Sequence, residues 1–166
     1  GAGLARLPAL IRAMPNTPAI VREAMTGLYA GAGATRSELK LASAVFESVG
    51  KVAVIDDEDL LNPVTGLSGS GPAYFFYLME LLAQEGVKGG LSEHQARLLA
   101  VQTALGAALL ASKAKESPEE LRRQVTSKGG TTEAALKIFE AKNLSEIFHE
   151  AIEAARKRGN ELSRGE

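Results

Sequence analysis

Two different patterns of apolar and polar residues divide the chain. Between residues 9 and 55 the apolar runs are short, namely ALIRAM (9–14), AIVR (19–22), AMTGLYA (24–30) and KVAVI (51–55). The segment 35–49 has helical spacing instead, with Thr35 as N-cap and Glu38 in the capping-box position. This half therefore predicts strand, strand, helix, strand. That is too little for a self-sufficient sheet and indicates the tail of an α/β domain.

After Asp56 the pattern becomes helical, and no further strand is predicted. Helices are expected at 72–87, 92–114, from Pro118, at 131–142 and at 145–162. Ser92 and Ser117 are the expected N-caps of two of them. The change falls near Asp57–Asp59, so we expect one domain over residues 1–57 and an all-helical domain over 58–166. The fold class is mainly α.

These helices have many apolar residues, and many of those side chains are small. Alanines recur along 92–114, at Ala96, Ala100, Ala104, Ala107, Ala108 and Ala111. A helix that is apolar on several sides must be covered on several sides, which is hard to arrange within one small bundle. The pattern therefore predicts a tightly packed homodimer.

Composition narrows the function classes. The chain has 166 residues, a net charge of −1 and no cysteine, so disulfides and thiolate catalysis are excluded. It has no basic block for nucleic acid, and no apolar run of membrane-spanning length. His94 and His149 lack a second histidine at ligand spacing, so no metal site is expected. A cytoplasmic location follows as the default.

The most distinctive stretch is LRRQVTSKGGTTEAAL, residues 121–136. Gly129 and Gly130 let the backbone turn sharply, and Thr131 or Thr132 can cap the helix that follows. The free N–H groups of a first helical turn suit a carboxylate or phosphate. An ordinary capped turn between two helices explains the same residues, and the pattern alone leaves both readings open.

A second glycine-rich stretch is VTGLSGSGPAY, residues 64–74. A dinucleotide-binding loop needs a third glycine where Tyr74 stands, and a strand directly before the motif. Two alternatives remain, a pocket lined by the hydroxyls and close helix packing permitted by the glycines.

Four segments together resemble the pyrroline-5-carboxylate reductase family. They are MPNTP (14–18), TGLSGSGPAY (65–74), EGVK (85–88) and QVTSKGGTT (124–132), and they stand in the family's order. The resemblance covers nearly the whole chain. It implies a Rossmann domain, of which residues 1–57 hold only the last strands and helix, followed by a helical dimerisation domain of the kind found in 6-phosphogluconate dehydrogenases. Dimers of this family often assemble further into rings.

The resemblance also implies a reaction, the reduction of 1-pyrroline-5-carboxylate to L-proline by NADPH or NADH, and a set of site residues. Thr132 is the expected catalytic residue, with its hydroxyl near the ring nitrogen. The expected substrate-binding residues are Glu58, Ser127, Gly129, Gly130, Thr131 and Thr132, with backbone N–H groups of Gly129, Gly130 and Thr131 holding the carboxylate. Asn16 and Gln124 match cofactor-contacting positions. Asn16 also fits a simple turn role, and Glu58 a solvated acid.

Two residues depart from the family pattern. Lys128 stands where proline is usual, and Arg123 where aspartate is common. Two alternative functions stay open, a non-catalytic helical dimerisation module and a related imine or β-hydroxy acid dehydrogenase. The latter usually has a catalytic lysine, and no lysine here lies in its motif.

Overall fold

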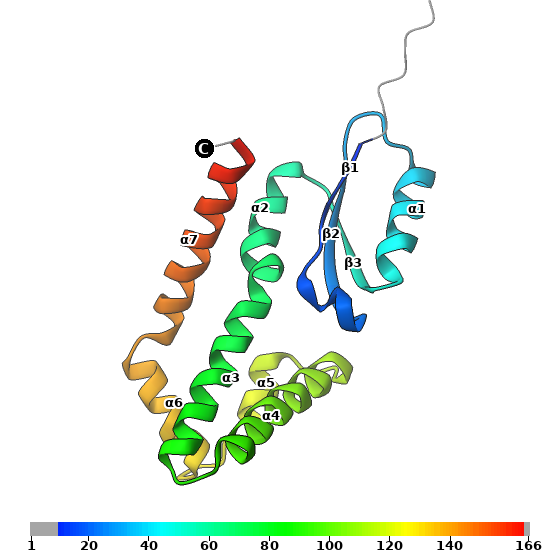
Figure 1. The fold of residues 1–166 in the computed structure, drawn as a ribbon. Coiled ribbons are helices and arrows are strands. Elements are labelled where there is room, and N and C mark those ends of the chain that lie inside the picture. Colours follow the sequence, from blue (N-terminus) through cyan, green and yellow to red (C-terminus); the bar gives the residue numbers. More distant parts are fainter. Residues whose placement is uncertain (1–9, 165–166) are drawn as a thin grey trace, which may run out of the picture. The chain divides into compact units, whose positions relative to one another are not determined.

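The computed structural model describes residues 10–164, which form two compact units. The first takes in residues 10–73 and 151–164, and the second residues 74–150 (Figure 1). Residues 1–9 of the predicted α/β remnant lie outside the described part. The predicted domain boundary between residues 57 and 58 stays a prediction, because the compact units divide the chain at other points, within two long helices.

The first unit contains a three-stranded sheet in the order β1-β2-β3, formed by β1 (Ile11–Met14), β2 (Ala24–Ala30) and β3 (Gly50–Ile55). β1 pairs antiparallel with β2, and β2 pairs parallel with β3. α1 (Arg36–Glu47) connects the parallel pair and begins at the predicted capping box of Thr35 and Glu38. The predicted α/β character of this region is therefore confirmed.

The sheet is covered on both faces at the middle of β2, where three successive residues are buried. Thr26 and Leu28 have no exposed surface, and both point to the face opposite Gly27. A Cβ at Gly27 would come within 2.8 Å of the Val64 side chain, so the second face is packed closely. This burial on both faces is what an apolar central strand requires.

The prediction of a strand at 19–22 is wrong. These residues belong mostly to a 3₁₀ helix, η1 (Thr17–Val21), with Pro18 at its start. Proline fixes φ near the helical value and cannot donate to a strand ladder. Arg22 ends this turn with φ of 62° and donates its N–H back to the carbonyl of Ala19, 3.0 Å away.

Residues 58–88 form a nearly continuous helical run in which the hydrogen-bond pattern changes. It passes through η2 (Glu58–Leu60), α2 (Leu61–Val64) and the π-helical segment η3 (Thr65–Gly69) into α3 (Gly71–Lys88). The N–H of Ser70 donates to the carbonyl of Thr65, 2.9 Å away, which is the π pattern. The glycine-rich stretch is thus helical, which does not agree with a strand-to-helix dinucleotide loop.

Glycines of η3 and α7 (Leu144–Arg164) permit close helix packing in the first unit. A Cβ at Gly66 would lie 3.4 Å from the backbone oxygen of Ile152, and one at Gly159 would lie 3.6 Å from the Thr65 side chain. Gly66 thus lies at a helix contact, as the packing alternative predicts, while the pocket alternative stays a prediction.

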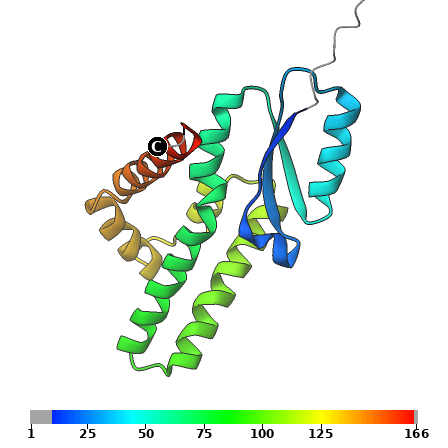
Figure 2. The ribbon, with the colours of Figure 1, turned by 45° about the horizontal axis from the view of Figure 1, so that its top comes forward.

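The second unit is entirely helical. Besides its part of α3 it contains α4 (Glu93–Lys113), α5 (Pro118–Gln124), α6 (Thr131–Ala141) and the first residues of α7 (Figure 2). Ser92 and Ser117 are the N-caps of α4 and α5, as predicted, and in both cases the structure shows a complete capping box. α3 and α4 pack closely where Gly86 meets Ala96, since a Cβ at Gly86 would lie 3.0 Å from that of Ala96. No helix within residues 10–164 combines the length and apolarity needed to cross a membrane.

A loop at the start of α6 and a groove between α3 and α4

The loop between α5 and α6 makes a tight turn before the helix begins. Gly129 has φ of 74°, a value that favours glycine. The N–H of Gly130 donates to the carbonyl of Ser127, 3.0 Å away, and a Cβ at Gly130 would collide with the Ser127 hydroxyl. Both glycines are therefore required by the turn itself.

Gly130, not a threonine, is the N-cap of α6, so the predicted capping by Thr131 or Thr132 is wrong. Both threonines lie inside the helix as its first two residues. The first helical hydrogen bond runs from the N–H of Ala134 to the carbonyl of Gly130, 3.2 Å away. The N–H groups of Thr131, Thr132 and Glu133 thus precede the helical ladder, at the positive end of the helix dipole.

A carboxylate of the chain itself already binds this loop. Glu133 Oε2 accepts a hydrogen bond from the N–H of Gly129 at 2.8 Å, and Glu133 Oε1 lies 3.5 Å from Lys137 Nζ. The Gly129 hydrogen bond, and then the Lys137 charge, lower the pKa of Glu133. Two of the expected backbone donors, Gly129 and Gly130, are therefore used within the loop, and Thr131 is the third.

Sequence reasoning did not select Glu133. Its relation to Lys137, four residues later, is a detectable helix pair. The hydrogen bond between the Glu133 carboxylate and the Gly129 N–H depends on the shape of the turn, so no spacing in the sequence indicates it.

Asn16 holds two segments of the first unit together. Its Oδ1 accepts the N–H of Met25, and its Nδ2 donates to the carbonyl of Ser68, both at 2.9 Å. The side chain is half-buried. An amide has four hydrogen-bonding positions, so one N–H and one lone pair remain after these two bonds. The cofactor-contacting role of Asn16 stays a prediction beside this structural one.

Glu58 is engaged by a residue that sequence reasoning also missed. Arg12 Nη1 donates to Glu58 Oε1 at 2.7 Å, and both side chains are nearly half exposed. Forty-six residues separate the pair in sequence, so no local pattern could reveal it. This contact does not test the substrate role of Glu58. A ligand that binds the Glu58 carboxylate would share that carboxylate with Arg12.

The remaining expected site residues stay predictions. Gln124 is the last residue of α5, and both it and Ser127 are exposed. Asn16 and Glu58 belong to the first unit, whereas Gln124, Ser127 and Gly129 to Thr132 belong to the second. Within the described residues no group of three acidic, histidine or cysteine side chains could hold a metal ion.

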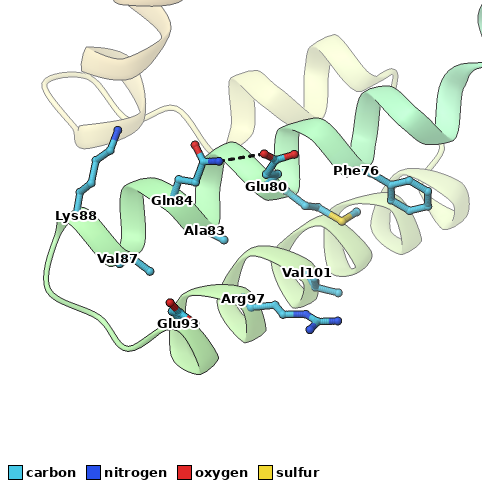
Figure 3. Close-up of a pocket in the computed structure, with 10 residues that line it drawn as sticks. Phe76, Glu80, Ala83, Gln84, Val87, Lys88, Glu93, Arg97 and Val101 are labelled. Atoms are coloured by element: carbon cyan, nitrogen blue, oxygen red, sulfur yellow. Dashed lines mark hydrogen bonds between the residues drawn. The ribbon is translucent and has the colours of Figure 1, made fainter.

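The second unit also carries an open apolar groove along α3 and α4, with a volume of about 730 Å³ (Figure 3). Phe76, Met79, Ala83, Val87 and Val101 supply its apolar lining. Charged side chains line it as well, including Glu80, which accepts a 3.0 Å hydrogen bond from Gln84. Among the described residues of this unit, only Ala96 and Ala100 are buried apolar side chains.

The described residues form a small α/β sheet unit followed in sequence by a long run of helices. Residues 58–162 match the family model described as pyrroline-5-carboxylate reductase dimerisation. The chain belongs to the pyrroline-5-carboxylate reductase family.

Individual relatives agree with this assignment. The chain is 46% identical to the pyrroline-5-carboxylate reductase of Pseudomonas aeruginosa over 93% of its own length and 56% of that protein. It is also 46% identical to the Arabidopsis thaliana enzyme, over 92% of its length and 55% of the relative. The chain therefore spans little more than half the length of these relatives.

Solved structures give the same result for the fold. A pyrroline-5-carboxylate reductase from Coxiella burnetii matches with a TM-score of 0.89 and 44% identity, over 93% of this chain and 57% of that one. The Plasmodium falciparum enzyme, solved with NADP bound, matches with a TM-score of 0.84 and 29% identity. The match covers 90% of this chain and 60% of that one. The predicted fold class is confirmed.

Proposed function

We propose that this chain is the dimerisation and substrate-loop part of an enzyme that reduces 1-pyrroline-5-carboxylate to L-proline with NADPH or NADH. The observation that carries the proposal is the start of α6, where a glycine turn leads into unpaired helix N–H groups followed by the Thr132 side chain. An imino acid has a carboxylate and a ring nitrogen, and this short segment offers a partner for each.

The substrate carboxylate is bound by the N–H groups of Thr131 and Thr132. Both precede the first helical hydrogen bond, and the helix dipole favours a negative charge at this point. Lys128, exposed on the preceding turn, adds a positive charge in the same segment. A carboxylate is preferred over a neutral group here because such donors are stronger toward an anion.

Thr132 acts on the ring nitrogen. Its hydroxyl donates a hydrogen bond to the imine nitrogen, or relays a proton to that atom as the C=N bond is reduced to a secondary amine. Thr132 is only half exposed, which limits the positions that its side chain can take. Serine could perform the same task, whereas alanine and valine could not.

A nicotinamide cofactor, when bound, supplies the hydride. The free N–H and lone pair of the Asn16 amide fit a polar group of such a cofactor, and Gln124 offers an exposed amide. These two residues would hold only part of it. The glycine fingerprint of a dinucleotide-binding loop does not occur in this sequence.

The partner of the helical unit is a second copy of this chain. Six large apolar residues of α4 are between 44% and 58% exposed, namely Leu98, Leu99, Val101, Leu105, Leu109 and Leu110. An exposed apolar surface of this extent marks an interaction site. The matching family model describes dimerisation, which favours a homodimer through α3 and α4. Assembly of dimers into a ring remains an expectation from the family resemblance, and a cytoplasmic location remains the default expectation from composition.

The test is cofactor oxidation by the protein that contains this chain together with its upstream sequence. With pyrroline-5-carboxylate as substrate, the wild type should oxidise NADPH or NADH, and Thr132→Ala should lower kcat/KM by about 100-fold. Thr132→Ser is the matched control and should keep most of the activity. A protein that binds cofactor but ignores this imine would contradict the proposal.

A second function, a related imine or β-hydroxy acid dehydrogenase, is favoured by one residue, Lys128, because such enzymes use a lysine. The substitution Lys128→Pro distinguishes this second function from the proposed reductase. It should retain reduction of pyrroline-5-carboxylate under our proposal and abolish activity if Lys128 were catalytic.

A further inference from the structure

Glu133 stands out among the charged residues near the loop because it binds backbone. Its carboxylate reaches back four residues to the N–H of Gly129, and the two heavy atoms are 2.8 Å apart. In a standard capping box the third helical residue binds the N-cap N–H instead. Here the N-cap is Gly130, so Glu133 fixes the residue before the cap.

The residue that Glu133 holds is the one that determines the shape of the turn. Gly129 has φ of 74°, in the left-handed region that glycine adopts readily and residues with a side chain rarely adopt. Its neighbour Gly130 donates to Ser127 within the same turn. The hydrogen bond that Gly129 donates to Glu133 therefore restrains the residue with the left-handed backbone conformation in this turn.

Lys137 restrains Glu133 in turn. The two oxygens of the carboxylate have different partners, Gly129 for Oε2 and Lys137 Nζ, 3.5 Å away, for Oε1. Lys137 also offsets the negative charge of Glu133, which would otherwise repel an anionic substrate at the start of the helix. The lowered pKa of Glu133 agrees with both contacts.

We infer that Glu133 is a positioning residue of the substrate loop, holding Gly129 so that the N–H groups of Thr131 and Thr132 face the carboxylate of the imino acid. This inference rests on the function proposed above. Glu133 itself does not touch the substrate. By occupying the Gly129 N–H, it excludes that group as a substrate donor and directs the carboxylate to the first turn of α6.

The experiment compares steady-state kinetics of variants in the protein that includes the upstream sequence. Glu133→Ala removes the acceptor and should raise KM for pyrroline-5-carboxylate about tenfold, with kcat and KM for NADPH nearly unchanged. Glu133→Gln keeps an acceptor oxygen and should raise that KM less than about threefold. A merely stabilising role would not produce this separation of the two KM values.

Glu140→Ala is the matched control, because Glu140 is an exposed glutamate near the other end of α6. It should leave all constants unchanged. If Glu133→Ala behaved like Glu140→Ala, or if Glu133→Gln were as impaired as Glu133→Ala, the positioning role would be overturned. A wild type that reduced no imine would overturn the proposed function first, and the inference with it.

Discussion

The side-chain amide of Asn16 donates a hydrogen bond to the carbonyl of Ser68, 2.9 Å away and 52 residues later in the chain. An α-helical partner for this carbonyl would be the N–H of residue 72, but Pro72 has none. Asn16 thus satisfies a carbonyl that the start of α3 leaves open. The same side chain binds Met25, so it connects the π-helical segment to β2.

We expect Asn16→Ala to lower the free energy of unfolding by about 1–3 kcal/mol, because a half-buried carbonyl and the Met25 N–H both lose their partner. Urea denaturation measures this. Asn62→Ala, in the same unit but without a described side-chain hydrogen bond, should cost clearly less. Equal losses would contradict the structural role of Asn16.

A double-mutant cycle tests the link to Pro72 directly. Pro72→Ala restores an N–H that can reach the Ser68 carbonyl within the helix. Asn16→Ala should therefore cost about 1 kcal/mol less in the Pro72→Ala background than in the wild type. Additive effects would show that Pro72 is not the reason for the contact.

The dimer is tested by placing a charge in the α3–α4 groove. Val101→Glu should raise the dimer dissociation constant by at least about 100-fold, since desolvating a carboxylate at the interface costs several kcal/mol. Sedimentation equilibrium gives the constant. Ile20→Glu is the control, because Ile20 is 90% exposed on η1, away from the groove residues in sequence. A dimer unaffected by Val101→Glu would exclude this face.

Glu133 should make one contribution to stability depend on pH. Its pKa in the folded chain lies below the ordinary 4.5. The contribution is therefore complete above about pH 4.5 and is lost as pH falls through the folded pKa. The difference in unfolding free energy between wild type and Glu133→Gln should be constant at neutral pH and shrink in acid. A difference that grew on acidification would contradict the assignment.

Local signals in the sequence predicted most of the elements. Thr35, Ser92 and Ser117 mark helix starts through side chains that act within three residues, so their predicted N-cap roles are confirmed. The short apolar runs likewise identify all three strands of the described sheet.

The errors have physical reasons. AIVR looks like a strand by its apolar residues, but Pro18 imposes a 3₁₀ turn. The contacts of Asn16 with Ser68 and of Arg12 with Glu58 join residues far apart in sequence, and only tertiary structure brings them together.

The central claim is that the first turn of α6 binds the carboxylate of the imino acid, and Thr131→Pro tests it most directly. Proline removes the N–H of Thr131 but is tolerated at the first helical position, after an extended Gly130. The variant should lower kcat/KM for pyrroline-5-carboxylate about tenfold and leave that for 1-pyrroline, which lacks the carboxylate, unchanged. Thr131→Val, which keeps the N–H, should behave like wild type. An equal loss on both substrates, or no loss on either, would contradict the account.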